Sequence, residues 1–204
     1  MTEPVRRICL FGGSFDPVHE GHLTIASAAR EACALDEVIF LPAACSPFKQ
    51  GKQHFLTDEE RMELLQLATA EQPWARVSDL DLTLPPPSWS WRLAAHFREL
   101  YPRAELYWLL GTDQWEQLHR WARYDYLLEQ LCFIVYHRGT EPQLREGARS
   151  VFLSGDHPAS SSRIRSCLEE GLPLPASWLH PAVAGRLTEI AAARRMGPSH
   201  VTNE

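Results

Sequence analysis

Continuous apolar runs alternate with amphipathic stretches along the chain. Runs of this kind are typical of strands that are buried on both faces of a parallel sheet. We expect strands at residues 6–11, 37–41, 76–80, 104–110, 131–136 and 151–153. Apolar positions at helical spacing predict helices at residues 23–34, 57–68, 89–100, 114–130 and 181–193, with an interruption near 119–123 and a further helix start at 160–162. This alternation predicts an α/β fold built on one doubly wound parallel sheet.

Proline-rich and polar segments separate these elements. Pro42 closes the second strand, and residues 43–55 are expected to form a loop at the carboxyl edge of the sheet. The segment Leu84–Pro87 is a break, because proline donates no hydrogen bond to a ladder and restricts the residue before it. Ser88 is a candidate cap for the helix that follows. We expect a single domain over residues 1–204, ordered from about 5 to 194, with a flexible tail at 196–204.

Composition indicates a globular protein with a full core, since the 204 residues are 45% hydrophobic and 23% charged. A net charge of −6 argues against non-specific binding to nucleic acid, so any affinity for phosphate must come from a local cluster. Five cysteines without a Cys-x-x-Cys pair indicate reduced thiols. No apolar run reaches about eighteen residues and no charged leader precedes one, so we expect a cytoplasmic protein without a membrane span.

The most informative segment runs from Gly12 to His22 and reads Gly-Gly-Ser-Phe-Asp-Pro-Val-His-Glu-Gly-His. It lies between an apolar run and an alanine-rich helix, which is the layout of a phosphate site at the mouth of a parallel sheet. Gly12 and Gly13 allow the backbone to approach a phosphate closely. The helix that begins near Gly21 turns free N–H groups toward an anion. His19 and His22 would bracket that anion from the loop and from the first helical turn.

Two other interpretations of the histidine pair are open. His-x-x-His is half of a zinc site, but no cysteine or carboxylate follows at ligand spacing, so no metal ligand is predicted. Ordinary surface or capping histidines are the second alternative. The glycine pair, the Phe-Asp-Pro turn and the preceding strand together favour the phosphate site.

A second candidate phosphate site is the segment from Ser160 to Arg165. Small hydroxyl side chains at a helix N-terminus offer O–H and N–H donors to phosphate oxygens. Arg165 would add positive charge, and Arg163 is a further candidate. The alternative is a serine-capped helix followed by solvated arginines. The presence of both segments in one chain favours the phosphate site.

Residues Gly12 to Leu23 resemble the first signature of the His-x-Gly-His nucleotidyltransferases, and within them the chain most resembles the bacterial nicotinate-nucleotide adenylyltransferase family. The segment Ala159 to Arg165 is similar to the family's Ile-Ser-Ser-Thr-x-Ile-Arg segment, with alanine in place of isoleucine and Ser162 in place of threonine. The resemblance spans about residues 7–187. It implies a single nucleotidyltransferase domain with a Rossmann-like sheet, helices on both faces, and transfer of AMP from ATP.

The resemblance also implies which residues bind each nucleotide. Catalytic roles fall to His19, His22 and Arg165, with His22 on the α-phosphate. The residues expected to bind ATP are Gly12, Gly13, Ser14, Phe15, His19, His22, Ser160, Ser161, Ser162 and Arg165. The residues expected to bind the acceptor nucleotide are Lys49, Ser88, Trp89, Ser90, Gly111, Asp113 and Trp121.

Two of the acceptor residues, Trp121 and Lys49, have alternatives of their own. Asp113 follows a strand, where a carboxylate can accept ribose hydroxyls, and the family pattern gives it that role. Trp121 is expected to stack on the nicotinate ring, although a tryptophan that only packs in the core is the alternative. Lys49 falls where the family has a basic residue after a proline-rich loop, although a lone loop lysine is usually solvated.

The chain departs from the family pattern between Asp81 and Ala94. The family's Ser-Tyr-Thr is Ser-Trp-Ser here, at residues 88–90, and Arg92 stands where the family has aspartate, which reverses a charge. This segment helps to hold the pyridine nucleotide in the family. The departure therefore leaves both the acid and the amide mononucleotide open as acceptors, while the phosphate-binding segments keep the family pattern.

The reaction that the resemblance implies belongs to NAD biosynthesis. A phosphate oxygen of nicotinate mononucleotide attacks the α-phosphorus of ATP, giving deamido-NAD and pyrophosphate. Mg²⁺ is the expected cofactor, held mainly through the ATP phosphates and water. The expected partners are ATP and nicotinate mononucleotide, without nucleic acid or membrane, and a homo-oligomer is compatible with the sequence. The alternatives are another acceptor, namely nicotinamide mononucleotide or phosphopantetheine, and a nucleotide-binding regulatory module without turnover.

Overall fold

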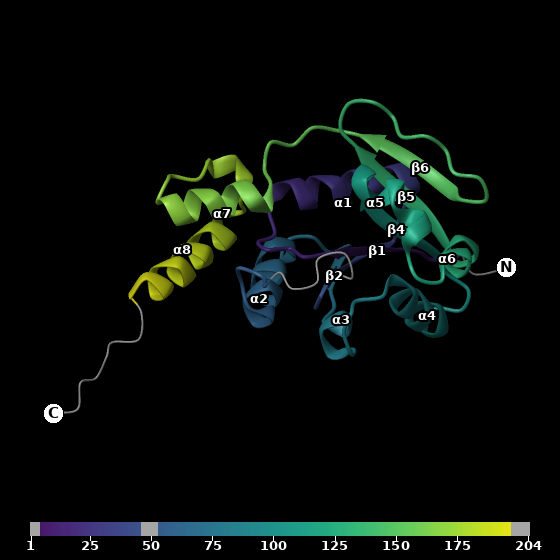
Figure 1. The fold of residues 1–204 in the computed structure, drawn as a ribbon, viewed down its shortest axis with the longest axis horizontal. Helices are drawn as coiled ribbons and strands as arrows, with labels where there is room; N and C mark the ends of the chain where they lie inside the picture. Colours follow the sequence, from purple (N-terminus) through teal and green to yellow (C-terminus); the bar gives the residue numbers. More distant parts are fainter. Residues whose placement is uncertain (1–4, 46–52, 197–204) are drawn as a thin grey trace.

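A parallel sheet forms the centre of the computed structural model, which describes residues 5–45 and 53–196. Within these residues the sheet has six strands in the order β3-β2-β1-β4-β5-β6 (Figure 1). The strands are β1 (Arg7–Gly13), β2 (Glu37–Pro42), β3 (Ala75–Val77), β4 (Glu105–Gly111), β5 (Leu131–His137) and β6 (Arg149–Ser154). The order reverses direction between β1 and β4, the point at which such sheets bind ligands beyond their carboxyl ends.

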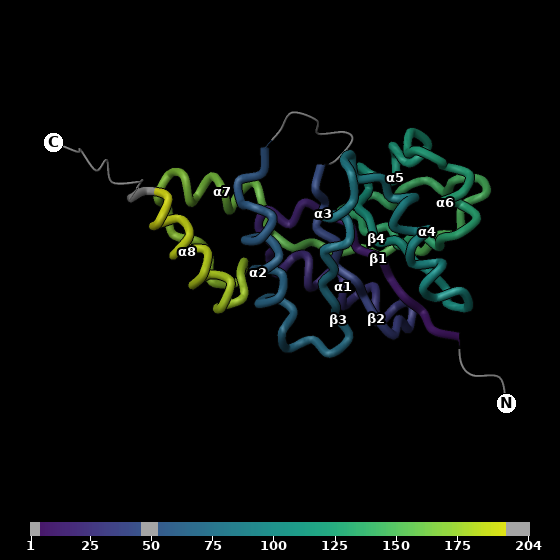
Figure 2. Tube along the Cα trace, turned by 90° about the horizontal axis from the view of Figure 1, so that it is seen from below, coloured from purple at the N-terminus to yellow at the C-terminus, as the bar shows by residue number. Residues whose placement is uncertain are grey.

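Helices cover both faces of the sheet, which confirms the doubly wound α/β fold. The helices are α1 (Glu20–Cys33), α2 (Asp58–Thr69), α3 (Leu80–Thr83), α4 (Ser90–Leu100), α5 (Thr112–Glu116), α6 (Tyr124–Gln130), α7 (Ser161–Glu170) and α8 (Pro181–Met196), with 3-10 turns at Leu118–Arg120 and Ala176–Trp178. Helices α1, α2, α7 and α8 pack on one face, and α4, α5 and α6 on the other. Both views place α7 and α8 at the end of the molecule opposite α4 and α6 (Figures 1 and 2).

The two core layers follow from the alternation of side chains along β1. Cys9 and Phe11 point into the layer under α1 and α2, whereas Ile8 and Leu10 point into the layer under α4. All four are buried. Strands buried on both faces read as continuous apolar runs, so the pattern that predicts β1 also predicts its position inside the sheet.

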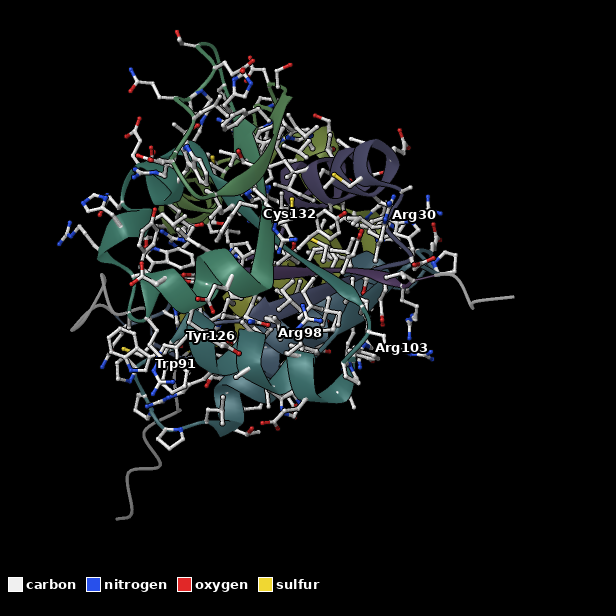
Figure 3. All side chains as sticks on the ribbon, turned by 90° about the vertical axis from the view of Figure 1, so that its right-hand side faces the viewer. Arg30, Trp91, Arg98, Arg103, Tyr126 and Cys132 are labelled. Atoms are coloured by element: carbon white, nitrogen blue, oxygen red, sulfur yellow. The ribbon has the colours of Figure 1, made fainter. Side chains whose placement is uncertain are left out.

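Arg98 links α4 to the chain segments that precede β4 and β5, at the amino edge of the sheet (Figure 3). From α4 its guanidinium donates to the Ala104 carbonyl at 2.7 Å and to the Gln130 carbonyl at 3.2 Å. These bonds join the C-terminal halves of α4 and α6 to the chain that enters β4. The opposite edge, where the loops carry the predicted site, is free of this constraint.

The predicted capping box at the start of α2 is confirmed. Thr57 accepts from the Glu60 N–H at 3.2 Å, and the Glu60 carboxylate accepts from the Thr57 N–H at 2.8 Å. The interruption predicted within residues 114–130 is also present. There α5 gives way to a 3-10 turn, and α6 follows Arg123, whose φ is +56°.

The predicted end of the third strand and the predicted cap of α4 are wrong. The strand expected at 76–80 ends at Val77, because the Ser78 hydroxyl accepts from the Leu80 N–H at 3.3 Å and turns the chain into α3. Ser88 does not cap α4, since its hydroxyl accepts instead from the Cys45 N–H at 3.0 Å. Helix α8 continues to Met196, and the remaining predicted tail lies outside the described residues.

Candidate functional site

The turn between β1 and α1 combines one residue in a left-handed conformation with two glycines that lie close to aromatic rings. Phe15 adopts a φ of +46°, a left-handed conformation that is strained for a bulky side chain and that clusters at functional sites. Its buried ring meets Phe11 edge to face at 5.3 Å. A Cβ on Gly13 would lie 3.0 Å from the Phe15 ring, and one on Gly12 would lie 3.1 Å from the Trp108 ring. The glycine pair therefore makes room for two aromatic rings.

The two histidines meet at the N-terminus of α1. Their ring centroids are 3.8 Å apart, with His19 as the N-cap residue and His22 in the first turn. The His19 N–H donates to His22 Nδ1 at 3.2 Å. Because Nδ1 accepts, the neutral ring of His22 carries its proton on Nε2, an assignment made from the hydrogen bonds. His22 thus has an N–H donor to offer to an anion.

Both histidines are neutral at physiological pH. Burial, followed by the neighbouring His157 and Arg138, lowers the pKa of His19 from 6.5 to about 4. Burial and then the adjacent His19 hold the pKa of His22 well below 6.5. A neutral imidazole donates only one hydrogen bond, so His22 can offer an anion one N–H donor and no imidazolium charge.

The free energy of unfolding is expected to fall as the pH is lowered from 6.5 to about 4. In this window the unfolded chain protonates His19, which the folded chain keeps neutral, so stability rises with pH and is lost toward acid. The shift corresponds to about 3 kcal/mol for His19. Urea unfolding at about pH 7 and about pH 4.5 measures the effect in the wild type, in His19→Gln and in a His119→Gln control at an exposed site. An equal loss on acidification in wild type and His19→Gln would contradict the buried neutral state of His19.

The second predicted segment is bound directly to the first. At the start of α7, the Ser161 hydroxyl donates to the Pro17 carbonyl at 3.0 Å. Arg165 donates to the Asp16 carbonyl at 2.5 Å and to the Ser162 hydroxyl at 3.2 Å. Segments about 145 residues apart in the chain therefore form one site, and the N-terminus of each helix, α1 and α7, opens onto it.

Arg163 does not contribute charge to this site. Its guanidinium donates to the Pro158 carbonyl at 3.1 Å and lies over the Trp178 ring, 4.8 Å from the centroid. The expectation that Arg163 is a further phosphate ligand is therefore wrong. Arg163 and Arg165 are two residues apart, about 200° around an α-helix, so they lie on different sides of α7.

Asp16 has a structural task that the motif alone does not indicate. Its buried carboxylate accepts from the N–H groups of Phe55 and Leu56 at 2.8 and 2.9 Å. This pair of bonds draws the chain before α2 onto the β1–α1 turn. As a result, Gln53 and His54 line the same cavity as His22.

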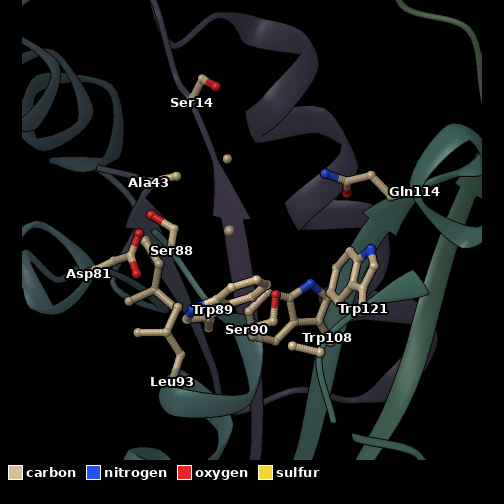
Figure 4. A pocket seen from close by; sticks show the side chains of 14 residues that line it. Ser14, Ala43, Asp81, Ser88, Trp89, Ser90, Leu93, Trp108, Gln114 and Trp121 are labelled. Carbon is tan, nitrogen blue, oxygen red and sulfur yellow. The ribbon is translucent and has the colours of Figure 1, made fainter. Parts of the chain in front are cut away.

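Two adjoining cavities open at the carboxyl edge of the sheet, and Ser14 lines both. We name the first the phosphate cavity; its lining includes Ser14, Phe15, Asp16, His22, Ser160, Ser161, Ser162 and Arg165. We name the second the tryptophan cavity (Figure 4); its lining includes Gly12, Gly13, Ser14, Asp81, Ser88, Trp89, Ser90, Trp108, Gln114 and Trp121. The phosphate cavity is lined by several hydroxyls and by the Arg165 guanidinium, whereas the tryptophan cavity is lined by indole rings.

The predicted ATP-binding residues divide between these cavities. Gly12 and Gly13 line the tryptophan cavity, and the others line the phosphate cavity except His19. The His19 ring is 8% exposed and packs behind His22, against Gly21. His19 therefore supports His22 in this arrangement, and His22 is the histidine that lines the cavity.

The predicted acceptor residues are only partly brought together. Ser88, Trp89, Ser90 and Trp121 line the tryptophan cavity. Gly111 and Asp113 are exposed and line neither cavity, because Asp113 lies on the outer side of the first turn of α5, while its neighbour Gln114 reaches the cavity. Lys49 lies outside the described residues.

Arg61 is a site residue that the sequence did not reveal. The side chain is fully buried, donates to the Ser14 carbonyl at 2.7 Å and pairs with Asp58 at 2.6 Å. It thus holds from α2 the residue that the two cavities share. The available signal was its spacing, because Arg61 lies on the same stripe of α2 as Leu64, Leu65 and Ala68.

Over the described ranges 5–45 and 53–196, no group of three histidine, cysteine or acidic side chains is placed to hold a metal ion. In the same part of the chain, no helix combines the length and apolar character needed to cross a membrane.

Comparisons with known proteins agree with this architecture. A family model described as cytidylyltransferase-like matches residues 10–167. A probable nicotinate-nucleotide adenylyltransferase of Neisseria meningitidis serogroup C is 32% identical over 83% of this chain and 92% of its own length. Another, from Methylacidiphilum infernorum, is 42% identical over 65% of this chain and 64% of its own length.

Solved structures show the same fold. The nicotinic acid mononucleotide adenylyltransferase of Plasmodium falciparum, solved with NaAD, superposes with a TM-score of 0.73 at 19% identity, covering 91% of this chain and 96% of that one. A putative nicotinate-nucleotide adenylyltransferase of Vibrio parahaemolyticus superposes with a TM-score of 0.67, covering 93% and 96%. Fold, phosphate segments and relatives together establish that the chain belongs to the cytidylyltransferase-like proteins, in the family of the nicotinate-nucleotide adenylyltransferases.

Proposed function

We propose that this protein transfers AMP from ATP to nicotinate mononucleotide, giving deamido-NAD and pyrophosphate. The observation that carries the proposal is the junction at Ser14 of a phosphate cavity with an aromatic cavity. A triphosphate and an aromatic mononucleotide held in these two spaces would meet beside His22. The relatives named above as nicotinate-nucleotide adenylyltransferases, and the Plasmodium structure with NaAD, support this choice of acceptor.

Catalysis in this site is alignment and charge stabilisation. The attacking phosphate oxygen and the departing pyrophosphate must be in line at the α-phosphorus of ATP, and no group of the protein forms a covalent bond. The Nε2–H of His22 would donate to an α-phosphate oxygen as negative charge builds on it. Arg165, the hydroxyls of Ser160 to Ser162 and the N-termini of α1 and α7 would hold the triphosphate.

Mg²⁺ fits this donor set only as a partner of the nucleotide. The phosphate cavity is lined by hydroxyls, the imidazoles of His22 and His54, a guanidinium and one carboxylate, Asp16, whose oxygens already accept two backbone N–H groups. We therefore assign Mg²⁺ to the ATP phosphates and water, with no side chain as a direct ligand. Its chemistry would be neutralisation of charge on the triphosphate.

Replacing Trp121 by alanine is expected to raise the KM for nicotinate mononucleotide about 10- to 100-fold, because the variant loses one stacking contact between the base and the indole ring. Trp121 lines the tryptophan cavity and meets Trp108 edge to face at 5.9 Å. Steady-state kinetics would show an unchanged KM for ATP. Trp74→Ala, a tryptophan that lines neither cavity, is the matched control. A raised KM for ATP alone would place Trp121 against the other nucleotide.

The reaction is tested by pyrophosphate release with ATP, Mg²⁺ and one acceptor at a time. Nicotinate mononucleotide, nicotinamide mononucleotide and phosphopantetheine are the acceptors to compare. The proposal predicts the highest kcat/KM with the nicotinate form. Turnover confined to another acceptor would change the substrate, and ATP binding without turnover would favour the regulatory module.

A further inference from the structure

Asp81 is a buried carboxylate inside the tryptophan cavity (Figure 4). It lies on the short helix α3 and is 3% exposed. One oxygen accepts from the Ala44 N–H at 3.1 Å. Within residues 5–45 and 53–196, no hydrogen bond reaches the other oxygen. A buried carboxylate accepts several hydrogen bonds, so an occupant of this cavity meets an acceptor in need of a donor.

Three hydrogen bonds tie the wall that carries Asp81 to the chain that leaves β2. Ala44 and Cys45 leave β2, and Asp81 holds the first of these amides while the Ser88 hydroxyl holds the second at 3.0 Å. The Ser88 N–H also donates to the Cys45 carbonyl at 2.8 Å. The Ser88 hydroxyl accepts from Cys45 and keeps its O–H as a donor, whereas Asp81 is the side chain of this clamp that offers a ligand acceptors alone.

The chemistry of the acceptor nucleotide limits what Asp81 can contact. Its phosphate and pyridine carboxylate are anions without a proton to donate, and a carboxylate repels them. The ribose hydroxyls are donors. Figure 4 shows Ser14 toward one end of the cavity and Trp89 and Trp121 toward the other, with Asp81 on the wall between them. A ribose lies between phosphate and base in any nucleotide, so the positions match.

Resting on the function proposed above, we propose that Asp81 binds a ribose hydroxyl of the acceptor mononucleotide. Binding of ribose was the role expected for Asp113 on α5, but Asp113 is exposed and lines neither cavity. In this proposal Asp81 on α3 takes that role. Asp81 is a binding residue in this account, and its second bond, to Ala44, keeps the carboxylate aimed at the ligand.

The test is calorimetric binding of nicotinate mononucleotide to wild type, to Asp81→Asn and to Asp79→Asn. The asparagine oxygen can still accept from Ala44, so the clamp is kept, and thermal unfolding checks it. Asp79 is an exposed neighbour and serves as the matched control. Loss of a charge-assisted hydrogen bond predicts a Kd about 10- to 100-fold higher for Asp81→Asn and an unchanged Kd for Asp79→Asn.

Acceptor analogues that lack the 2′- or the 3′-hydroxyl separate ligand contact from a structural effect. The inference predicts that one of them binds equally well to wild type and Asp81→Asn, because the partner of the carboxylate is gone. An unchanged Kd for Asp81→Asn, or a loss that persists with both analogues, overturns it while leaving the proposed function intact. Absence of wild-type binding to nicotinate mononucleotide overturns the proposed function and this inference together.

Discussion

Replacing His22 by alanine is expected to lower kcat about 100- to 1000-fold, the cost of one lost transition-state donor. His22 lines the phosphate cavity, and its Nδ1 already accepts from the His19 N–H, so its proton sits on Nε2. Alanine removes that donor at the position where charge develops. The KM for ATP should change far less than kcat, because the contact strengthens in the transition state.

Two further variants sharpen this measurement. His22→Asn offers an amide N–H in a shorter side chain and is expected to recover part of the lost kcat, while His96→Ala removes an exposed histidine and should leave kcat unchanged. Initial rates of pyrophosphate release at saturating substrates give all three values. A His22→Ala enzyme with more than about half of the wild-type kcat would remove His22 from the mechanism.

Replacing Arg61 by methionine is expected to lower the free energy of unfolding by about 3 kcal/mol. The fully buried guanidinium donates to the Ser14 carbonyl and to Asp58. Methionine fills much of the space but leaves the Ser14 carbonyl without its charged donor. Asp58 is half exposed and recovers water, so most of the loss comes from the β1–α1 turn.

The control for Arg61 is Arg186→Met. Arg186 pairs with Glu63 at 2.8 Å between α8 and α2, but both side chains are more than a third exposed. Exposed ion pairs contribute little to stability because solvent screens them, so this change should cost far less than Arg61→Met. Urea unfolding compares the two variants. An equal loss of unfolding free energy in the two variants would contradict the stabilising role of the buried Arg61 guanidinium.

Local patterns in the sequence were sufficient to find the two segments that line the phosphate cavity. Strand, glycine turn and helix follow one another from Arg7 to Cys33, and the serine cap of α7 lies within six residues of Arg165. Backbone geometry inside each segment determines where its donors point. That the two segments meet follows from the topology, because both open at the carboxyl edge of one parallel sheet.

The acceptor side depended on contacts that no local pattern contains. Asp81 bonds an amide 37 residues away, and Arg61 bonds a carbonyl 47 residues away. Each reads in the sequence as an ordinary charged residue on a helix. Ser88 was expected to cap α4 but is held by Cys45, so its correct place required knowledge of how β2 and α4 face each other. These roles come from packing, which the sequence pattern does not encode.

Transfer of the α-phosphoryl group is the central claim, and isotope tracing tests it most directly. ATP labelled at the α-phosphate is incubated with Mg²⁺, nicotinate mononucleotide and the protein, and the products are separated. The account predicts that the label appears in deamido-NAD, with unlabelled pyrophosphate in equal amount and no label retained on the denatured protein. Label found only in free AMP or ADP, or bound to the protein, would contradict direct in-line transfer between the two cavities.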